Sequence, residues 1–589
     1  MRRRLALASS LIVLFAAGSI RVIGARDRDQ QTPPAAAPTP TPSPTPKVDE
    51  EDGTPITSAA VKAACGDCHS EDAKHRFTRI SYRRTTPEGW QETIRRMVSL
   101  NKASIEPDQA REVVKYLSDH LGLAPEEVKP AAFEVERRLI DFKYTGDAET
   151  ERVCSSCHSI GRVMLQRRSA QEWNLLINMH RGWYPLVDFQ VFRRQGPADT
   201  EPGADGRPPD SRHPYEKAVA HLKSAFPLTT QEWTAWSATM RSPQLAGTWA
   251  LKGYENGSGP FYGQMTITAG ASPDEFTTST SFTYPRSGKT VTRAGRAVIY
   301  TGFQWRGRST VGGNDATSLR EVMMIDRDWR TLSGRWFTGG YDEIGVDVQL
   351  TRVSREPVVL GLDRPSIKVS SSAQGVRLYG ANLPANLSAS DIDFGRGVSV
   401  TRVVSSTPTL VTMDVTVAAD APPGAHDLVV SGVVARAAVA IYSQVDFIKI
   451  SPGWNMARVG GVVFPKMLAQ FEAIAYSNGP DGKPDTNDDI ALGPVDATWT
   501  TEEYMTTYDD DDVKFVGEID GRSGAFTPAL DGPNPARSGN RNNVGDVWVV
   551  AVVPAPQGAA NQTPMRARAH LVVTVPLFMR WDFFTVGAR

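Results

Sequence analysis

The sequence predicts a chain of several domains, in which one all-α domain is followed by three all-β domains of the barrel or immunoglobulin-like sandwich type. From about residue 59 to residue 240, apolar residues recur three and four positions apart, as in VVKYLSDHLG and EWNLLINMH, which is typical of amphipathic helices. After Gln244, apolar and polar residues alternate between Gly, Asn and Asp turns, which is typical of antiparallel strands with one solvated face. The chain therefore has a helical part and a larger β-rich part.

The N-terminus predicts export. A basic start, MRRR, precedes an apolar run from Leu5 to Ile20 that Arg21 interrupts, so residues 1–25 are expected to be a signal peptide or, alternatively, an uncleaved membrane anchor. Residues 26–54 include seven prolines between Gln31 and Lys47 and are expected to form an extended linker. We therefore expect a periplasmic protein.

Four folded segments are expected after this linker: a helical domain at 55–242, an antiparallel β domain at 243–356, and immunoglobulin-like β domains at 357–441 and 442–589. The composition is 40% hydrophobic and 22% charged, with a formal net charge of -1. Such a balance is ordinary for a soluble globular protein and gives no electrostatic basis for binding nucleic acid.

Helix starts are visible inside the helical segment. Ser169 with Glu172 matches the S-x-x-E capping box, and Thr86 followed by Pro87 places a cap and a first-turn proline before the helix that carries Trp90.

All four cysteines of the chain lie in two short sequences, ACGDCH and VCSSCH, as Cys65, Cys68, Cys154 and Cys157. A redox dithiol is expected in a βαβ setting, which the helical surroundings do not provide, and a zinc site does not require a histidine directly after each pair. Covalent haem attachment requires both features, because two thiolates add to the vinyl groups of one porphyrin and the next histidine, here His69 or His158, binds the iron. The helical segment is therefore predicted to be a dihaem cytochrome c domain with two haem c groups.

An internal repeat suggests the opposite axial ligands. Each attachment sequence is followed by an Arg-Arg pair and a capped helix with a tryptophan, Trp90 or Trp173, and seven residues later stands Met97 or His180. Seven residues are almost two helical turns, so tryptophan and candidate ligand share one helix face. We expect the tryptophans to pack against the porphyrins, with His69 and Met97 on one iron and His158 and His180 on the other.

Alternatives to these ligands remain open at this stage. The same spacing recurs between Trp233 and Met240 without a third attachment sequence, so it also marks an ordinary buried helix face. Met240 and His120 are alternative ligands, as are Met164 and Met179. A methionine ligand would give its haem the higher reduction potential.

The acidic sequence NGPDGKPDTNDDIALG has two interpretations. Asp481, Asp485, Asn487, Asp488 and Asp489 offer the oxygen ligands that calcium prefers, but the EF-hand register and its final glutamate are missing. The alternative is an ordinary polar hairpin.

Taken together, the two haem sequences, RRTTPEGW with its echo QRRSAQEW, the segment KYLSDHLGLAPEE and the β-rich part beginning near GTWALKGYENGSGPFYG resemble the alpha subunit of quinohaemoprotein amine dehydrogenase. The resemblance implies assembly with a β-propeller subunit and a small subunit that carries a tryptophan-derived quinone. It also implies that amines are oxidised to aldehyde and ammonia at that quinone. The haems of this chain would then pass electrons to an external acceptor, a copper protein or a cytochrome c.

No catalytic residue is predicted on this chain itself. A quinone cross-linked through cysteine needs a free thiol, and the haem sequences use all four. Two alternatives are a free-standing dihaem electron carrier whose β domains bind a surface or partner, and a dihaem peroxidase, which would need one iron open to peroxide.

Overall fold

A computed structural model of the chain describes residues 51–132, 144–193, 208, 210–338, 345–505, 510–555 and 563–576. The predicted signal peptide and most of the predicted linker lie outside these residues. Within the described part, no helix combines the length and the apolar character needed to cross a bilayer.

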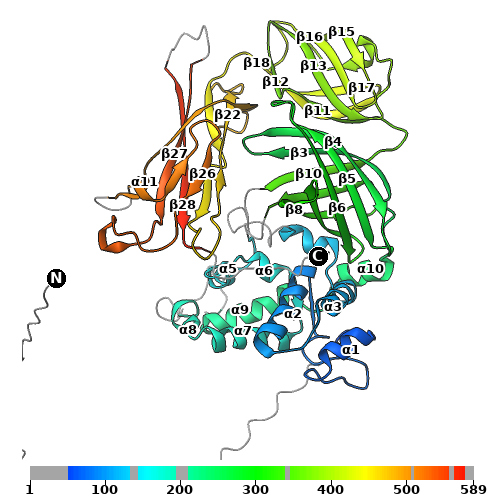
Figure 1. Ribbon diagram of the computed structural model, residues 1–589, viewed down its shortest axis with the longest axis vertical. Coiled ribbons are helices and arrows are strands. Elements are labelled where there is room, and N and C mark those ends of the chain that lie inside the picture. Colours follow the sequence, from blue (N-terminus) through cyan, green and yellow to red (C-terminus); the bar gives the residue numbers. More distant parts are fainter. Residues whose placement is uncertain are drawn as a thin grey trace, which may run out of the picture. The chain divides into compact units, whose positions relative to one another are not determined.

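The first folded domain is helical, and Figure 1 labels most of its helices. In chain order the helices are α1 (Ala59–Cys65), α2 (Pro87–Asn101), α3 (Pro107–His120), α4 (Pro125–Val128), the 3-10 turn η1 (Lys129–Ala131), α5 (Ala148–Ser155), α6 (Gly161–Met164), α7 (Ala170–Trp183), α8 (Val187–Gln190), α9 (Pro214–Ala225) and α10 (Gln231–Thr239). The predicted caps are confirmed, because the Thr86 side chain accepts from Gly89 N and the Ser169 side chain accepts from Glu172 N. Each half of the domain has its own apolar core.

A two-stranded ribbon, which the sequence pattern did not predict, joins the two halves. Strand β1 (Arg83–Thr85) pairs antiparallel with β2 (Gln166–Arg168), and Arg84 lies opposite Arg167. When the repeats are aligned on their tryptophans, these two arginines are equivalent residues. The ribbon therefore relates the halves by an approximate two-fold axis that passes between the arginines.

The same hydrogen bonds recur in both halves. After α3, the Leu121 carbonyl accepts from the Trp90 indole at 3.1 Å and from Thr85 N at 3.1 Å. After α9, the Phe226 carbonyl accepts from the Trp173 indole at 2.9 Å and from the equivalent β2 backbone nitrogen at 3.3 Å. The repeat is thus longer than the sequence alignment suggested, because it includes α3 and α9.

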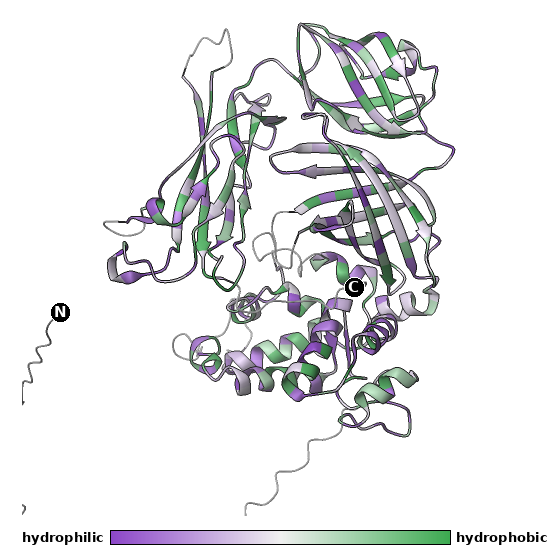
Figure 2. Ribbon diagram, in the orientation of Figure 1, coloured by the Kyte–Doolittle hydropathy of each residue, from purple (hydrophilic) through white to green (hydrophobic). Residues whose placement is uncertain are grey.

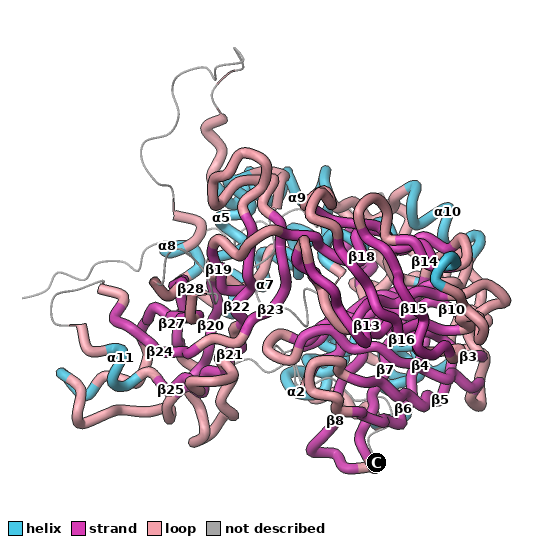
Figure 3. Tube along the Cα trace, turned by 90° about the horizontal axis from the view of Figure 1, so that it is seen from above, coloured by secondary structure: helices cyan, strands magenta, loops and turns pink. Residues whose placement is uncertain are grey.

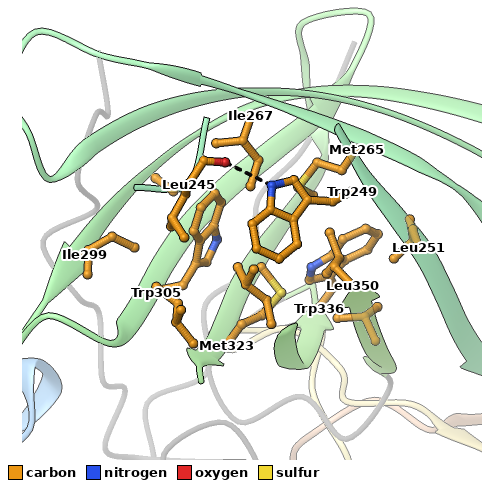
Figure 4. Packing of buried hydrophobic residues seen from close by; sticks show 14 of the residues in the cluster. Leu245, Trp249, Leu251, Met265, Ile267, Ile299, Trp305, Met323, Trp336 and Leu350 are labelled. Atoms are coloured by element: carbon orange, nitrogen blue, oxygen red, sulfur yellow. Dashed lines mark hydrogen bonds between the residues drawn. The ribbon is translucent and has the colours of Figure 1, made fainter. Parts of the chain in front are cut away.

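A closed eight-stranded barrel follows, with strand order β10-β3-β4-β5-β6-β7-β8-β9. Its strands are β3 (Gly247–Glu255), β4 (Gly259–Ala269), β5 (Glu275–Thr283), β6 (Thr290–Tyr300), β7 (Gln304–Val311), β8 (Asn314–Ile325), β9 (Thr331–Phe337) and β10 (Gly345–Arg352). Hydrophobic and hydrophilic residues alternate along these strands (Figure 2), and in β5 every second residue is buried. Side chains fill the interior, where Trp249, Trp305 and Trp336 lie together and the Trp249 indole donates to the Leu245 carbonyl at 2.9 Å (Figure 4).

The last two domains are β-rich, as expected, and Figure 3 shows their strands. In the third domain, two four-stranded sheets are formed by β11 (Val358–Leu362), β12 (Ser366–Lys368), β13 (Ser371–Ala381), β14 (Ile392–Asp393), β15 (Val398–Ser406), β16 (Leu410–Val417), β17 (Gly424–Val430) and β18 (Val433–Tyr442), with the 3-10 turn η3 (Ala389–Asp391). Apolar residues from both sheets meet in one core between them. This arrangement is a sandwich.

The fourth domain contains three sheets around a second apolar core. Its elements are β19 (Phe447–Ser451), β20 (Trp454–Arg458), β21 (Ala469–Gln470), β22 (Glu472–Ser477), β23 (Ile490–Val495), β24 (Thr498–Glu503), α11 (Asp512–Phe515), β25 (Gly517–Ile519), β26 (Ala525–Pro528), η4 (Ser538–Asn540), β27 (Gly545–Val553) and β28 (Met565–Thr574). The fold class predicted from the sequence, a helical domain followed by a barrel and sandwich domains, is therefore confirmed.

Polar contacts connect the first half of the helical domain to the barrel. The buried Glu88 of α2 accepts from Arg306 Nη2 of β7 at 3.2 Å. Lys115 of α3 lies 2.8 Å from Asp274, which precedes β5. Because these partners are largely enclosed, the ion pairs fix α2 and α3 against the barrel.

Candidate haem sites

The first attachment sequence forms a tight turn at the end of α1. The backbone N–H groups of Cys68 and His69 both donate to the Cys65 carbonyl, at 3.2 and 2.9 Å. The His69 Nδ1 lies 2.9 Å from the Thr78 carbonyl. A hydrogen bond at Nδ1 leaves Nε2 as the ligating nitrogen and fixes the orientation of the ring.

The second attachment sequence begins in α5 and places His158 in a half-buried position. Its Nδ1 lies 2.8 Å from the Ser159 carbonyl. Burial, with a further contribution from the charge of Arg162, lowers the pKa of His158 to about 4. The ring is therefore neutral near pH 7, which is the form that binds a metal.

The four cysteines form no disulfide with one another. Burial raises the pKa of Cys65 to about 11, with a smaller contribution from Cys68. Burial, followed by the charge of Asp147, raises the pKa of Cys154 to about 12. Unpaired thiols at this spacing are chemically suited to form thioether links.

The structure brings His158 and His180 together. Their ring centres are 6.4 Å apart and the ring planes make an angle of 52°. The His180 Nδ1 lies 2.8 Å from the Leu176 carbonyl of its own helix, which leaves Nε2 available. Two imidazoles bound to opposite sides of one metal at about 2 Å place their ring centres roughly 6 Å apart. The observed separation fits one iron between two axial histidines.

The chain matches a model described as quinohemoprotein amine dehydrogenase A, alpha subunit, haem binding, over residues 56–197. Models for domains II, III and IV of the same alpha subunit match residues 242–353, 359–443 and 448–583.

The chain belongs to the quinohemoprotein amine dehydrogenase alpha subunit family. The alpha subunit is part of an oxidoreductase and contains a haem-binding domain. As one subunit of a larger enzyme, it has partner subunits. No match is found among curated proteins.

Comparison with solved structures finds likenesses to parts of the chain. A redesigned beta barrel is 17% identical, covers 20% of this chain and 98% of its own length, and has a TM-score of 0.17. A tandem of titin domains is 8% identical, covers 53% of this chain and 100% of its own length, and has a TM-score of 0.10. TM-scores this low do not establish a shared fold.

The matched haem-binding region contains all the predicted axial ligands, but Met97 differs from His180 in its surroundings. Met97 is half buried on α2, and its sulfur lies 3.7 Å from the Asn101 side-chain nitrogen. Ligation by Met97 stays a prediction, as does the role of Met179, which is half buried beside His180.

The other reserve ligands have different partners. His120 is exposed at the end of α3 and stacks on Tyr116 with ring centres 4.0 Å apart. Met240 lies against the barrel, where a Cβ on Gly302 would come within 2.9 Å of its side chain. Met164 packs between the core of the second half and the barrel core. These positions favour Met97 as the ligand of one iron and His180 as the ligand of the other.

The two repeated tryptophans have a clear structural role. Trp90 and Trp173 are each 1% exposed, and their indole N–H groups are bound by the carbonyls that end α3 and α9. Arg83 lies over the Trp90 ring at 5.1 Å, and Arg168 lies over the Trp173 ring at 5.7 Å. Trp90 thus connects α2 to the end of α3, and Trp173 connects α7 to the end of α9. Contact of either indole with a porphyrin stays a prediction.

Sequence reasoning missed the acid at the centre of the domain. Buried Glu127 lies 2.9 Å from Arg84 Nη1 and 3.0 Å from Arg167 Nε, the two arginines at the two-fold axis. Burial alone would raise the pKa of Glu127, but the hydrogen bonds and charge of Arg84 and the charge of Arg167 lower it below its ordinary value. The repeated Arg-Arg pairs were visible in the sequence, whereas their shared partner lies outside both copies.

The acidic loop at Asp481 to Asp489 is hydrogen-bonded internally. Asp488 accepts from Asp481 N at 3.1 Å, and Lys449 lies 3.0 Å from Asp485 and 3.4 Å from Asp489. These contacts favour the polar hairpin over calcium. Within the residues that the structure describes, acidic groups at metal-binding spacing occur instead at Glu503, Asp510 and Asp512, and Arg537 contacts Asp512 there.

Proposed function

We propose that this chain is the electron-transfer subunit of a periplasmic quinohaemoprotein amine dehydrogenase. Two haem c groups, attached through Cys65 with Cys68 and through Cys154 with Cys157, supply one-electron chemistry. Electrons come from a tryptophan-derived quinone on a small partner subunit and leave to a copper protein or a cytochrome c. The observation that carries this proposal is the pair His158 and His180, with ring centres 6.4 Å apart.

The two histidines favour electron transfer over peroxide chemistry at the second haem. Both rings are held by backbone carbonyls at Nδ1, and burial lowers the pKa of both. Neutral imidazoles on both sides of an iron fill its axial positions and leave none for peroxide. His158 and His180 would thus hold the iron through Nε2, and the Ser159 and Leu176 carbonyls would fix the orientation of the two rings.

Amine oxidation to aldehyde and ammonia belongs to a partner subunit in this proposal. The four cysteines occupy the two haem sequences, so no thiol remains to cross-link a quinone on this chain. The β domains, which form most of the chain, hold the β-propeller subunit and the small quinone-bearing subunit.

The proposal is tested by purifying the exported protein with its partners and adding a primary amine without oxygen. We expect two covalent haems, a companion that stains for quinone, and reduction of the haems by the amine. The double variant Cys154→Ala/Cys157→Ala should keep one covalent haem, and Cys65→Ala/Cys68→Ala should keep the other. A lone polypeptide whose haems are not reduced by amines would support the free-standing carrier instead.

A further inference from the structure

The barrel is packed at its centre (Figure 4), but a cavity of about 840 Å³ opens at one of its mouths. The lining includes residues near the ends of β3, β5 and β9, such as Glu255, Phe282 and Trp336, and near the starts of β6 and β10, such as Val291 and Val346. Because neighbouring strands of the barrel are antiparallel, these positions all lie at the same mouth. Small-molecule sites have volumes of roughly 300–1,000 Å³, so the cavity is large enough for a ligand.

Aromatic rings form one wall of this cavity. Phe261, Phe282 and Trp336 line it together, and the ring centre of Phe282 is 4.6 Å from that of Phe261 and 6.1 Å from that of Trp336. Val291 and Leu319 add aliphatic surface. Such a wall binds the apolar part of a ligand because contact with it removes apolar surface from water. The cavity therefore suits a molecule with an apolar chain or ring.

Arg293 of β6 places a positive charge inside the apolar mouth. It lines the cavity, is 6% exposed, and lies three residues after the first residue of β6, which is roughly 10 Å along the strand. Its Nε donates to the Ser309 hydroxyl at 3.1 Å, and its Nη2 donates to the Ser309 and Thr317 carbonyls at 2.8 and 2.5 Å. Its Nη1 has no hydrogen-bond partner in the described part of the chain, yet it is not fully enclosed. The N–H groups on Nη1 are therefore open to the cavity.

The charge of Arg293 has no ion-pair partner among the residues that the structure describes. The charge of the buried Glu321 acts on Arg293 from beyond ion-pair distance, and its Oε2 accepts from the Trp305 indole at 3.1 Å. A buried charge is costly unless it is paired, which favours a bound anion. Each acid of the cavity lining already has a partner of its own: Glu255 contacts Tyr284, Glu472 contacts Tyr254, and Asp496 contacts Arg286.

We propose that this mouth of the barrel binds an amphipathic organic anion, a small molecule with one carboxylate and an apolar body. The carboxylate accepts hydrogen bonds from Arg293 Nη1, and the apolar body lies along Phe282 and Trp336 toward the opening. The guanidinium is already held by Ser309 and Thr317, so binding costs little further side-chain entropy. The site belongs to the second domain and does not depend on the haems.

The test measures binding to the full-length, haem-loaded protein by equilibrium dialysis. Three probes share one dodecyl chain and differ in charge: dodecanoate, dodecan-1-ol and dodecyltrimethylammonium. We expect one dodecanoate per chain, with the alcohol bound about tenfold more weakly and the cation more weakly still, because only the carboxylate forms charge-assisted hydrogen bonds with Arg293.

Two variants separate the charge from the wall. Arg293→Gln should weaken dodecanoate binding about 10- to 100-fold and leave binding of the alcohol unchanged, because it removes the charge and keeps the apolar surface. Arg296→Gln is the matched control, since Arg296 is exposed on the same strand and does not line the cavity. Val291→Trp fills the opening and should abolish binding of all three probes, whereas Ala294→Trp adds the same ring at an exposed position of β6 and should not. Thermal unfolding checks that each variant is folded.

Absence of saturable dodecanoate binding to the wild type would overturn the inference. Equal affinity for the anion and the cation would overturn it too, because Arg293 would then set no preference. Dodecanoate binding that survives Val291→Trp would place the probe on other apolar surfaces, with the same consequence. If Arg293→Gln does not fold, the ranking of the three probes on the wild type and the result for Val291→Trp still decide.

Discussion

The two halves of the helical domain have the same backbone frame but differ in the chemistry placed on it. Trp90 and Trp173 make equivalent hydrogen bonds to the ends of α3 and α9. Seven residues later, α2 presents Met97 whereas α7 presents His180 beside His158. Equivalent hydrogen bonds therefore keep the backbone frame the same in both halves, while single positions on one helix face determine what each half can bind.

The outer faces of the two halves differ as well. Glu88 in the first half is paired with Arg306 of the barrel, and the equivalent position in the second half is Gln171. The second half instead exposes large apolar side chains after His180, namely Trp183, Tyr184, Leu186 and Phe189. The first half is therefore held against the barrel by an ion pair, and the second half presents exposed apolar side chains.

The largest expected effect comes from exchanging the residues that distinguish the halves. His180→Ala should convert one low-spin haem to high spin, because it removes an axial ligand, and Met97→Ala should do the same to the other haem. His180→Met should raise the potential of the second haem toward that of the first. Absorption spectra and redox titration measure these changes. A low-spin spectrum that survives Met97→Ala would show that the ligand of the first iron lies elsewhere.

The next effect concerns what the halves share. Glu127→Gln leaves Arg84 and Arg167 buried without a counter-charge and should cost about 3–5 kcal/mol of unfolding free energy. Glu126→Gln is the control, because exposed Glu126 pairs with exposed Arg327 and such pairs contribute about 0–1 kcal/mol. Denaturant unfolding of the haem-loaded proteins measures both values. Similar losses in the two variants would contradict the role of Glu127.

Acidification should reduce the difference in unfolding free energy between the wild type and Glu127→Gln. The folded pKa of Glu127 is lowered, so its stabilisation is fully present above the unfolded carboxyl pKa and is lost as pH falls through the folded value. A difference between the two proteins that grows on acidification would contradict this assignment.

The smallest expected effect tests whether the halves are equivalent. Trp90→Phe and Trp173→Phe each remove one indole hydrogen bond and some buried volume, and each should cost about 1–2 kcal/mol. The carbonyl acceptors keep their second, backbone donor, which limits the loss. Thermal unfolding measures both. A much larger cost in one half would mean that the repeated hydrogen bonds do not carry equal weight.

Features with a local sequence pattern could be predicted from the sequence. The helix caps at Thr86 and Ser169 were visible because capping depends on residues three positions apart. The sequences LVTMDVTVAA and DVWVVAVVP form β16 and β27, and their alternation of apolar and polar residues with period two is typical of a half-buried strand.

Features that depend on distant residues could not be predicted. The β1–β2 ribbon has three residues per strand and is rich in arginine, so no alternation marks it. The partnership of Glu127 with both Arg84 and Arg167 joins three separate segments.

The short ribbon between the repeats has the symmetry of a subunit interface. Each half completes its neighbour across an approximate two-fold axis, with equivalent arginines face to face, which is the self-complementary contact made by two identical subunits. Within this one polypeptide, the helical domain is therefore built like a two-fold dimer of its own halves.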